Sequence, residues 1–309
     1  MDFNRRIAFL PALCLGLAIS IPLASPAKHA VGQSTAAAPK SDSETFTMQE
    51  DVLYGSVEGT ALHLDVYQPA GGSGGARPAV VLIHGGGWSS LDRRTMRNMG
   101  QFLARSGFVA FAVDYRLLQG RQGRWPAQLD DVQRAVRWVR ANASKYSVNP
   151  ARIGAFGHSS GAQLAALLGM EDTRDNSDAS LAKFSSKVQA VVDVSGPTDF
   201  TQDHEAADGF LSNFLGAPFS ERPEVWREAS PAYHVAKDNA PFLIVHGTQD
   251  DHVPMSQAQE LYEKLQSAGV PASLIKVNDG HTFQTPEARH QLAIESLGFF
   301  NRYLVVAQQ

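Results

Sequence analysis

Short apolar runs alternate with segments of helical spacing along most of the chain, beginning near residue 50. Eight of the runs have the length and composition of strands, and they cover residues 52–58, 62–67, 79–83, 108–113, 153–156, 188–194, 242–245 and 272–277. Apolar side chains recur every three or four positions in five longer segments, which predicts helices over residues 95–106, 126–145, 160–169, 256–268 and 287–303. Strands that alternate with helices predict an α/β fold, in which a mostly parallel central sheet carries helices on both faces.

Two segments, residues 171–187 and 200–231, fit this alternation poorly. The second is rich in large aromatic side chains, among them Phe210, Phe214 and Trp226, and we predict that it forms a small lid. In a parallel sheet, chemistry is carried by loops beyond the carboxyl ends of the strands. The residues that directly follow each predicted strand are therefore the first candidates for a functional site.

The first 27 residues have the pattern of a secretory signal peptide. Arg5 and Arg6 precede an apolar run over residues 7–24, and residues 25–27 supply a cleavage site. We therefore predict a secreted or periplasmic protein from which residues 1–27 are removed; the alternative is that the apolar run stays as a membrane anchor. Residues 28–45, rich in Ala, Ser, Lys and Pro, are predicted to be a disordered linker.

Composition narrows the classes of protein further. Of the 309 residues, 43% are hydrophobic, and the net charge of −4 comes from 27 basic and 31 acidic residues. A weakly acidic chain lacks the clustered Lys and Arg that phosphate binding needs, so no nucleic-acid partner is expected. The one cysteine, Cys14, excludes an intrachain disulfide framework and a cysteine-rich metal site. No cofactor is implied, and no stable membrane association is expected after the signal peptide is removed.

The first candidate site follows the predicted strand over residues 153–156. Gly157-His158-Ser159-Ser160-Gly161 has the pattern G-x-S-x-G between a strand and a helix, which is typical of a nucleophile elbow. Such a turn is too tight for side chains at its ends, and it exposes the hydroxyl of Ser159 at a helix start, where negative charge is favoured. Ser159 is therefore the candidate nucleophile rather than its neighbour Ser160; the alternative is that it only caps the helix.

The second candidate feature is the run of three glycines in residues 84–88, which follows the third predicted strand. The run does not fit the phosphate-binding pattern G-x-G-x-x-G, because Ser90 stands where the last glycine is needed, and a Walker lysine is missing. A loop that offers backbone N–H groups to an oxyanion fits better, because glycine lets the backbone approach a substrate closely. A plain glycine-rich turn is the alternative. The predicted N–H donors are Gly86, Gly87 and Ser160.

A serine hydroxyl is a weak nucleophile and needs a base, and the base needs a carboxylate to orient it. On folds with a nucleophile elbow, the acid and then the histidine follow the serine. The loop after the seventh predicted strand holds Asp250, the candidate acid, with Asp251 as the adjacent alternative, and the loop after the eighth holds His281, the candidate base. The histidines that fit the role of base less well are His84, His252 and His290. The first is expected to hold the glycine loop, the second is too near the acid in sequence, and the third lies inside a predicted helix.

Together these motifs resemble the α/β-hydrolase superfamily, and more closely its secreted carboxylesterases of the acetyl-esterase/lipase group, with their feruloyl/acetyl-xylan esterase-like branch. The resemblance is carried by residues 84–88, 114–117, 125–131, 149–153, 157–161, 230–231, 246–254 and 280–283. It implies that residues 46–309 are one α/β-hydrolase catalytic domain. The family spacing H-G-x-x-D-x-x-V-P marks the acid as Asp250, and the resemblance places Trp88 as a substrate contact lining the acyl site.

The resemblance implies hydrolysis of carboxylic esters by acyl transfer through a serine, a histidine and an aspartate. The expected substrates are short-chain or aromatic esters, including acetyl or feruloyl esters of polysaccharides. The same scaffold also carries serine peptidases and arylformamidases, and a non-catalytic binding protein can keep the fold, so these remain the alternatives. A prolyl-oligopeptidase-like enzyme usually carries a large β-propeller before its catalytic domain, and the predicted linker is too short to contain one.

Overall fold

The computed structural model describes residues 45–71, 75–202 and 204–306. The predicted signal peptide, residues 1–27, lies outside the described residues, and so does the predicted linker apart from Thr45, its last residue. All described residues belong to one of the two compact units of the chain, residues 41–309.

The described residues form an eight-stranded sheet with the strand order β1-β2-β4-β3-β5-β6-β7-β8. The strands are β1 Phe46–Val57, β2 Thr60–Pro69, β3 Arg77–Ile83, β4 Val109–Val113, β5 Val148–His158, β6 Ala190–Val194, β7 Phe242–Gly247 and β8 Ala272–Val277. The pairs β1–β2 and β2–β4 are antiparallel, and the other five are parallel. The predicted mostly parallel sheet is therefore confirmed.

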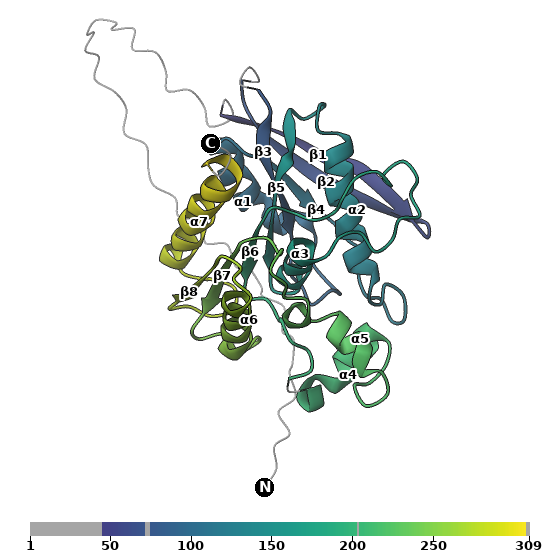
Figure 1. The fold of residues 1–309 in the computed structure, drawn as a ribbon. Helices are drawn as coiled ribbons and strands as arrows, with labels where there is room; N and C mark the ends of the chain where they lie inside the picture. The colour runs from purple at the N-terminus through teal and green to yellow at the C-terminus, as the bar shows by residue number, and fades with distance from the viewer. Residues whose placement is uncertain (1–44, 72–74, 203, 307–309) are drawn as a thin grey trace, which may run out of the picture. The chain divides into compact units, whose positions relative to one another are not determined.

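Helices cover both faces of this sheet (Figure 1). They are α1 Arg97–Arg105, α2 Ala127–Ala141, α3 Ser160–Met170, α4 His204–Leu215, α5 Pro223–Glu228, α6 Met255–Ser267 and α7 Pro286–Phe300. Alternate side chains of a strand point to opposite faces, so each face has its own hydrophobic core. Val80 and Leu82 of β3 join the core under α1 and α7, whereas Val81 and Ile83 join the core under α2, α3 and α6.

Strand β1 begins six residues before the predicted start at residue 52. It lies at the edge of the sheet, where polar residues such as Thr47 and Gln49 remain exposed or partly exposed. Phe46 and Met48 alternate with these exposed residues and pack against one core, but Glu50 and Asp51 are both exposed at an irregularity of the strand. The alternation is therefore interrupted just before the predicted start at residue 52.

The two segments that fit the alternation poorly take different structures. Residues 200–231 contain α4 and α5, which lie next to each other outside the two helical layers, and Phe214 and Trp226 within them are fully buried (Figure 1). Residues 171–187 contain neither a helix nor a strand. The buried guanidinium of Arg137 on α2 holds this second segment, because it donates hydrogen bonds to its backbone carbonyls.

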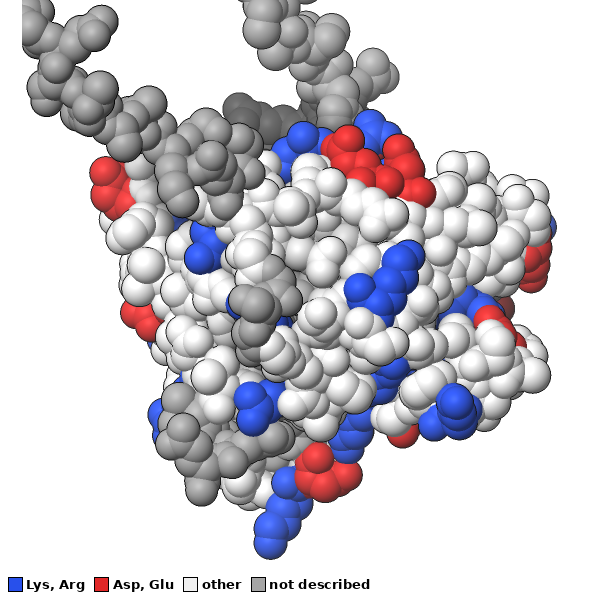
Figure 2. All heavy atoms as spheres, turned by 90° about the horizontal axis from the view of Figure 1, so that it is seen from above, with Lys and Arg blue, Asp and Glu red and all other residues white. Residues whose placement is uncertain are grey.

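Within the described ranges, no helix has both the length and the apolar content needed to cross a membrane. On the face of the molecule shown in Figure 2, basic and acidic side chains are interspersed in small groups over a mostly uncharged surface. This mixed arrangement differs from the single-sign basic surface with which proteins bind nucleic-acid phosphates.

Candidate active site

The candidate site lies at the carboxyl ends of the central strands β3 and β5, which end side by side. These two strands are paired, and the chain leaves β3 toward β4 on one side and β5 toward β6 on the other. In open α/β sheets, ligands bind at such a point, where the direction of the connections reverses. The predicted oxyanion loop follows β3 and the predicted elbow follows β5, so the fold brings the two motifs together.

The elbow joins β5 directly to α3, and Ser159 is the single residue between them. Its backbone angles are φ 55° and ψ −124°, which non-glycine residues rarely adopt. A Cβ atom added to Gly157 would lie 2.1 Å from the carbonyl oxygen of Gly161, and one added to Gly161 would lie 2.3 Å from that of Ile83. Neither glycine can therefore be replaced without moving the backbone, which agrees with the tightness predicted for this turn.

The structure brings the three predicted residues of the nucleophile, base and acid together. Nε2 of His281 lies 2.8 Å from Oγ of Ser159, and Nδ1 of His281 lies 2.7 Å from Oδ2 of Asp250. Asp250 follows β7 and His281 follows β8, two neighbouring parallel strands. The serine, histidine and carboxylate thus form one chain of hydrogen bonds across three loops.

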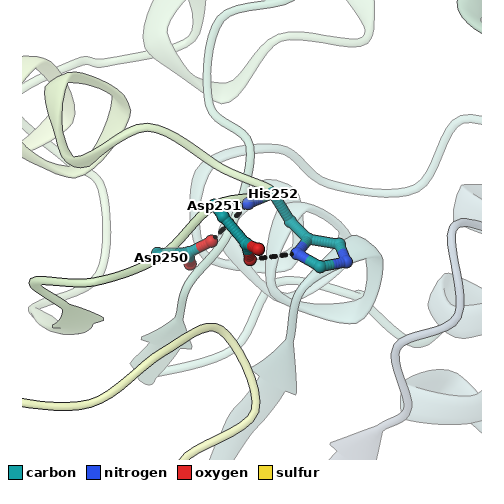
Figure 3. Close-up of side chains that lie close together, drawn as sticks. All are labelled: Asp250, Asp251 and His252. Carbon is teal, nitrogen blue, oxygen red and sulfur yellow. Dashed lines mark hydrogen bonds and ion pairs between the residues drawn. The ribbon is translucent and has the colours of Figure 1, made fainter. Parts of the chain in front are cut away.

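Asp250 and Asp251, which Figure 3 shows with His252, differ in burial and in hydrogen-bond partners. The side chain of Asp250 is 1% exposed, and its Oδ1 accepts hydrogen bonds from the backbone N–H groups of His252 and Val253, both at 2.9 Å. The side chain of Asp251 is 82% exposed and contacts only the ring of His252 in this picture. Burial raises the pKa of Asp250, but the hydrogen bonds from His281 and these N–H groups outweigh it and bring the pKa to about 2. Asp250 is therefore an ionised acceptor at neutral pH.

Two further histidines, His158 and His252, lie beside His281, and the sequence analysis predicted this position for neither of them. Nε2 of His158 lies 2.9 Å from the backbone carbonyl oxygen of His281. Burial lowers the pKa of His158, so its neutral ring donates this hydrogen bond from Nε2. The ring of His252 stacks on that of His281, with centroids 4.9 Å apart and an angle of 12°. Only the position of His158 inside the G-x-S-x-G pattern could have pointed to its place beside the base.

The glycine loop after β3 has a backbone that residues with a side chain rarely adopt. Gly86 has a φ of 112°, and a Cβ atom there would lie 2.1 Å from the carbonyl oxygen of Ser90. Among the described residues, none accepts a hydrogen bond from the backbone N–H of Gly86, Gly87 or Ser160. His84 is 1% exposed and stacks on Tyr115, whose hydroxyl donates to the His84 carbonyl at 3.0 Å. Nδ1 of His84 lies 2.7 Å from the carbonyl oxygen of Gly85, so its side chain holds the loop, as expected, and the three N–H groups remain available.

Trp88 links the glycine loop to the elbow helix and to residues 200–231. Its ring is stacked on Phe214 with centroids 4.4 Å apart, and its Nε1 donates to the side chain of Gln163 on α3 at 3.0 Å. Gln163 in turn donates to the carbonyl of Ala229 at 2.8 Å. Trp88 is 5% exposed, so most of its ring supports the loop and only a small part is free to contact a substrate.

We expect Gly86→Ala to lower kcat for ester hydrolysis by about 10²–10³-fold, because the added Cβ must displace the loop that carries the N–H donors. Gly298→Ala on α7 is the matched control, since its Cβ would meet nothing within 4 Å. Steady-state kinetics on a short p-nitrophenyl ester measures both, with thermal unfolding as the check of folding. A folded Gly86→Ala protein with undiminished kcat would show that this loop does not supply the N–H donors for the oxyanion.

A buried carboxyl group lies beside the elbow. Asp193 on β6 is 0% exposed, and its Oδ1 accepts a hydrogen bond from the N–H of Gly196 at 3.0 Å. Its Oδ2 has no hydrogen-bond partner among the described residues. Burial raises the pKa of Asp193 to about 7, and the N–H of Gly196 offsets only part of this effect. The folded protein therefore holds a proton on this group that the unfolded chain releases near pH 4.

This difference predicts a pH-dependent stability. Between about pH 4 and pH 7 the unfolded chain ionises Asp193 while the folded chain keeps it neutral, so this group makes the fold less stable as the pH rises. Asp193→Asn cannot ionise and should raise the free energy of unfolding at pH 8 by on the order of 4 kcal/mol, with little change at pH 4. Denaturant unfolding at the two pH values measures this; an equal effect of the substitution at both would contradict it.

One group of side chains in the described part of the chain has the spacing of metal ligands, namely Asp250, Asp251 and His252. Each already has a partner. Asp250 binds His281 and two backbone N–H groups, and Oδ1 of Asp251 lies 2.7 Å from Nδ1 of His252 (Figure 3). We interpret this group as the loop that orients the acid.

Comparisons with curated proteins point to ester hydrolases. The chain is 30% identical over 222 residues to the probable carboxylic ester hydrolase LipM of Mycobacterium tuberculosis. The aligned region covers 70% of this chain and 51% of LipM. It is 31% identical over 229 residues to esterase LipC of the same organism, covering 72% of this chain and 56% of LipC. The chain thus spans about half the length of these curated relatives.

Solved structures match over nearly their whole length. A truncated carbohydrate esterase from gut microbiota has a TM-score of 0.72 and 30% identity, covering 86% of this chain and 98% of that chain. The butyrate-bound esterase Est2 of Thermogutta terrifontis has a TM-score of 0.72 and 25% identity, covering 84% and 96%. Residues 64–265 match the family BD-FAE. The chain therefore belongs to the BD-FAE family and has the α/β-hydrolase fold of these esterases.

Proposed function

We propose that this protein is a serine carboxylesterase in which Ser159 is the nucleophile, His281 the general base and acid, and Asp250 the orienting carboxylate. The observation that carries the proposal is the pair of hydrogen bonds on His281, 2.8 Å to Oγ of Ser159 and 2.7 Å to Oδ2 of Asp250. Ester hydrolases among the relatives support the reaction class.

The reaction begins when Oγ of Ser159 attacks the ester carbonyl carbon and Nε2 of His281 takes the hydroxyl proton. The carbonyl oxygen becomes an oxyanion, which the N–H groups of Gly86, Gly87 and Ser160 stabilise. The intermediate then collapses: the C–O bond to the alcohol breaks, and His281 returns the proton to the leaving oxygen. A water molecule, deprotonated by His281, attacks the acyl-enzyme, and the acid is released as Ser159 regains its proton.

Asp250 serves this cycle as a fixed negative charge. Its pKa of about 2 keeps it ionised, so it accepts the Nδ1–H of His281 and leaves Nε2 free to face Ser159. The same charge stabilises the imidazolium that forms when His281 takes the proton. The two backbone N–H groups on Oδ1 hold the carboxylate in one orientation.

For the substrate, we propose short-chain or aromatic esters, including acetyl or feruloyl esters attached to polysaccharides. The match to a carbohydrate esterase structure supports the last class. The exposed ring of Phe210, which stacks on Trp88 beside the oxyanion loop, favours apolar or aromatic groups. We further propose that the protein acts outside the cytoplasm after loss of residues 1–27, and N-terminal sequencing of the exported protein tests this.

A panel of substrates tests the proposed activity. The account predicts hydrolysis of p-nitrophenyl acetate and butyrate and of acetylated or feruloylated xylan, with far slower cleavage of p-nitroanilides and N-formylkynurenine. Faster cleavage of an anilide would favour a peptidase, and faster cleavage of the formamide an arylformamidase. If the protein hydrolysed no ester in the panel, the proposed activity would be rejected, and a non-catalytic binding protein on the same fold would be favoured.

A further inference from the structure

A second pocket, of about 350 Å³, lies between α1 and α7 beyond the ends of β5 and β6. Its volume is at the lower end of the range of about 300–1,000 Å³ in which small-molecule sites fall. Ser159, His281, Gly86, Gly87 and Trp88 do not line it. Gly85, His158 and Thr282 do line it, so the pocket borders the candidate site without including its proposed reacting groups or N–H donors.

The wall of this pocket is mainly apolar and includes Met96, Met99, Phe102, Phe283 and Leu292. Methionine side chains are flexible and polarisable, so they adapt to apolar ligands of different shape. No acidic side chain lines the pocket. An uncharged or anionic molecule with a flexible hydrocarbon part therefore fits this lining best.

Two bulky residues of the lining have a left-handed backbone conformation, which such residues rarely adopt. Leu91 has a φ of 68° and is 55% exposed, and Phe283 has a φ of 51° and is buried. Strain of this kind persists only where the surrounding structure enforces it, and it is concentrated at functional sites. At Leu91 it keeps an apolar side chain at the rim of the pocket, accessible to a ligand.

The pocket also has one cation. Arg289 on α7 lines it, and the Nη1 group donates to the backbone carbonyls of Phe283 at 3.4 Å and Gln284 at 2.6 Å. Of the carboxylates that the structure describes, none forms an ion pair with Arg289. A guanidinium has five N–H donors, so these two carbonyls leave donors for a carboxylate ligand.

We propose that this pocket binds an aliphatic carboxylate of medium chain length, with its chain against the methionine and phenylalanine side chains and its carboxylate on Arg289. Apolar walls with a single cation complement a molecule of this kind in both shape and charge. The acids released by ester hydrolysis are also carboxylates, so a link to product feedback, though not the binding itself, rests on the proposed function.

The pocket also touches the residues that hold the base. His158 lines it and donates to the carbonyl of His281, and Thr282, the next residue along the chain, lines it as well. The hydrocarbon chain of a bound carboxylate would therefore contact His158 and Thr282, which adjoin the backbone of His281. Occupancy is expected to change kcat for a short ester without competing with that ester for its site.

Isothermal titration calorimetry of decanoate and of decanol into the full chain carrying Ser159→Ala tests the binding. We expect one decanoate per chain. Arg289→Gln should weaken the binding of decanoate by about tenfold, which corresponds to the loss of one charge-assisted hydrogen bond. The same substitution should leave the affinity for decanol unchanged. Ala293→Trp, which fills the pocket from α7, should abolish binding of both. Because the titration requires no turnover, its outcome is independent of whether the proposed esterase activity is correct.

Three outcomes would overturn the proposal. They are a failure of decanoate to bind, binding of decanoate that survives Ala293→Trp, and an equal loss of affinity for decanoate and decanol in Arg289→Gln. Binding that survives both substitutions would place decanoate elsewhere, for instance beside Ser159. Thermal unfolding checks that the tryptophan variant is folded. Arg289 is exposed and its replacement leaves the cores intact, so this variant decides the question even if Ala293→Trp fails to fold.

Discussion

Replacing Ser159 with alanine is expected to lower kcat for short p-nitrophenyl esters by about 10⁴–10⁶-fold, the range found when a triad serine is removed. The hydroxyl is the group at the elbow from which His281 takes a proton in the proposed reaction, since Nε2 lies 2.8 Å from Oγ. Without it no acyl-enzyme forms, and only slow attack by water near the oxyanion donors remains. Initial-rate kinetics with p-nitrophenyl acetate measures the loss.

The adjacent serine supplies the matched control for this experiment. Ser160→Ala keeps the backbone N–H that we assign to the oxyanion and removes only a buried hydroxyl, so activity should stay within about tenfold of wild type. Equal rates for wild type and Ser159→Ala, or a larger loss in Ser160→Ala, would reject Ser159 as the nucleophile.

The second large effect is expected at the acid. Asp250→Asn should lower kcat by about 10⁴-fold, because an amide cannot hold the tautomer with Nδ1–H or stabilise the imidazolium. The buried carboxylate accepts from His281 and from two backbone N–H groups, and asparagine can replace only part of this set. The kinetic measurement is the same, and KM should change far less than kcat.

Asp251→Asn is the control, and it separates the two neighbouring carboxylates. Its side chain is 82% exposed and its contact is the exposed ring of His252, so kcat should change by less than about threefold, as is usual for exposed ion pairs. A large loss in Asp251→Asn together with a small loss in Asp250→Asn would show that the acid was assigned to the wrong residue.

The convergence of Ser159, Asp250 and His281 could be predicted because each follows directly after a strand with a clear apolar pattern. Ser159 also stands in a local motif of five residues, and the strands β5, β7 and β8 are close in the sheet. The alternation of strands and helices was therefore sufficient to predict both the fold and the edge of the sheet that carries these loops.

Other parts of the site depend on contacts between distant residues, and no local pattern reports them. Trp88 stacks on Phe214, and the partner comes from the segment that fitted neither a strand nor a helix pattern. His158 and His252 meet the base only because three loops converge. The early start of β1 was missed for a different reason, since an irregularity between Gln49 and Val52 interrupts the alternation of the strand.

The central claim is that Ser159 reacts covalently with an acyl-like electrophile. A fluorophosphonate is the suitable probe, because it modifies a serine hydroxyl that an adjacent base activates. Mass spectrometry of the peptide that contains residues 157–161 after treatment with a fluorophosphonate gives the answer. We predict one adduct per chain, on Ser159, and almost none in Asp250→Asn; an unmodified peptide, or an adduct on another residue, would contradict the account.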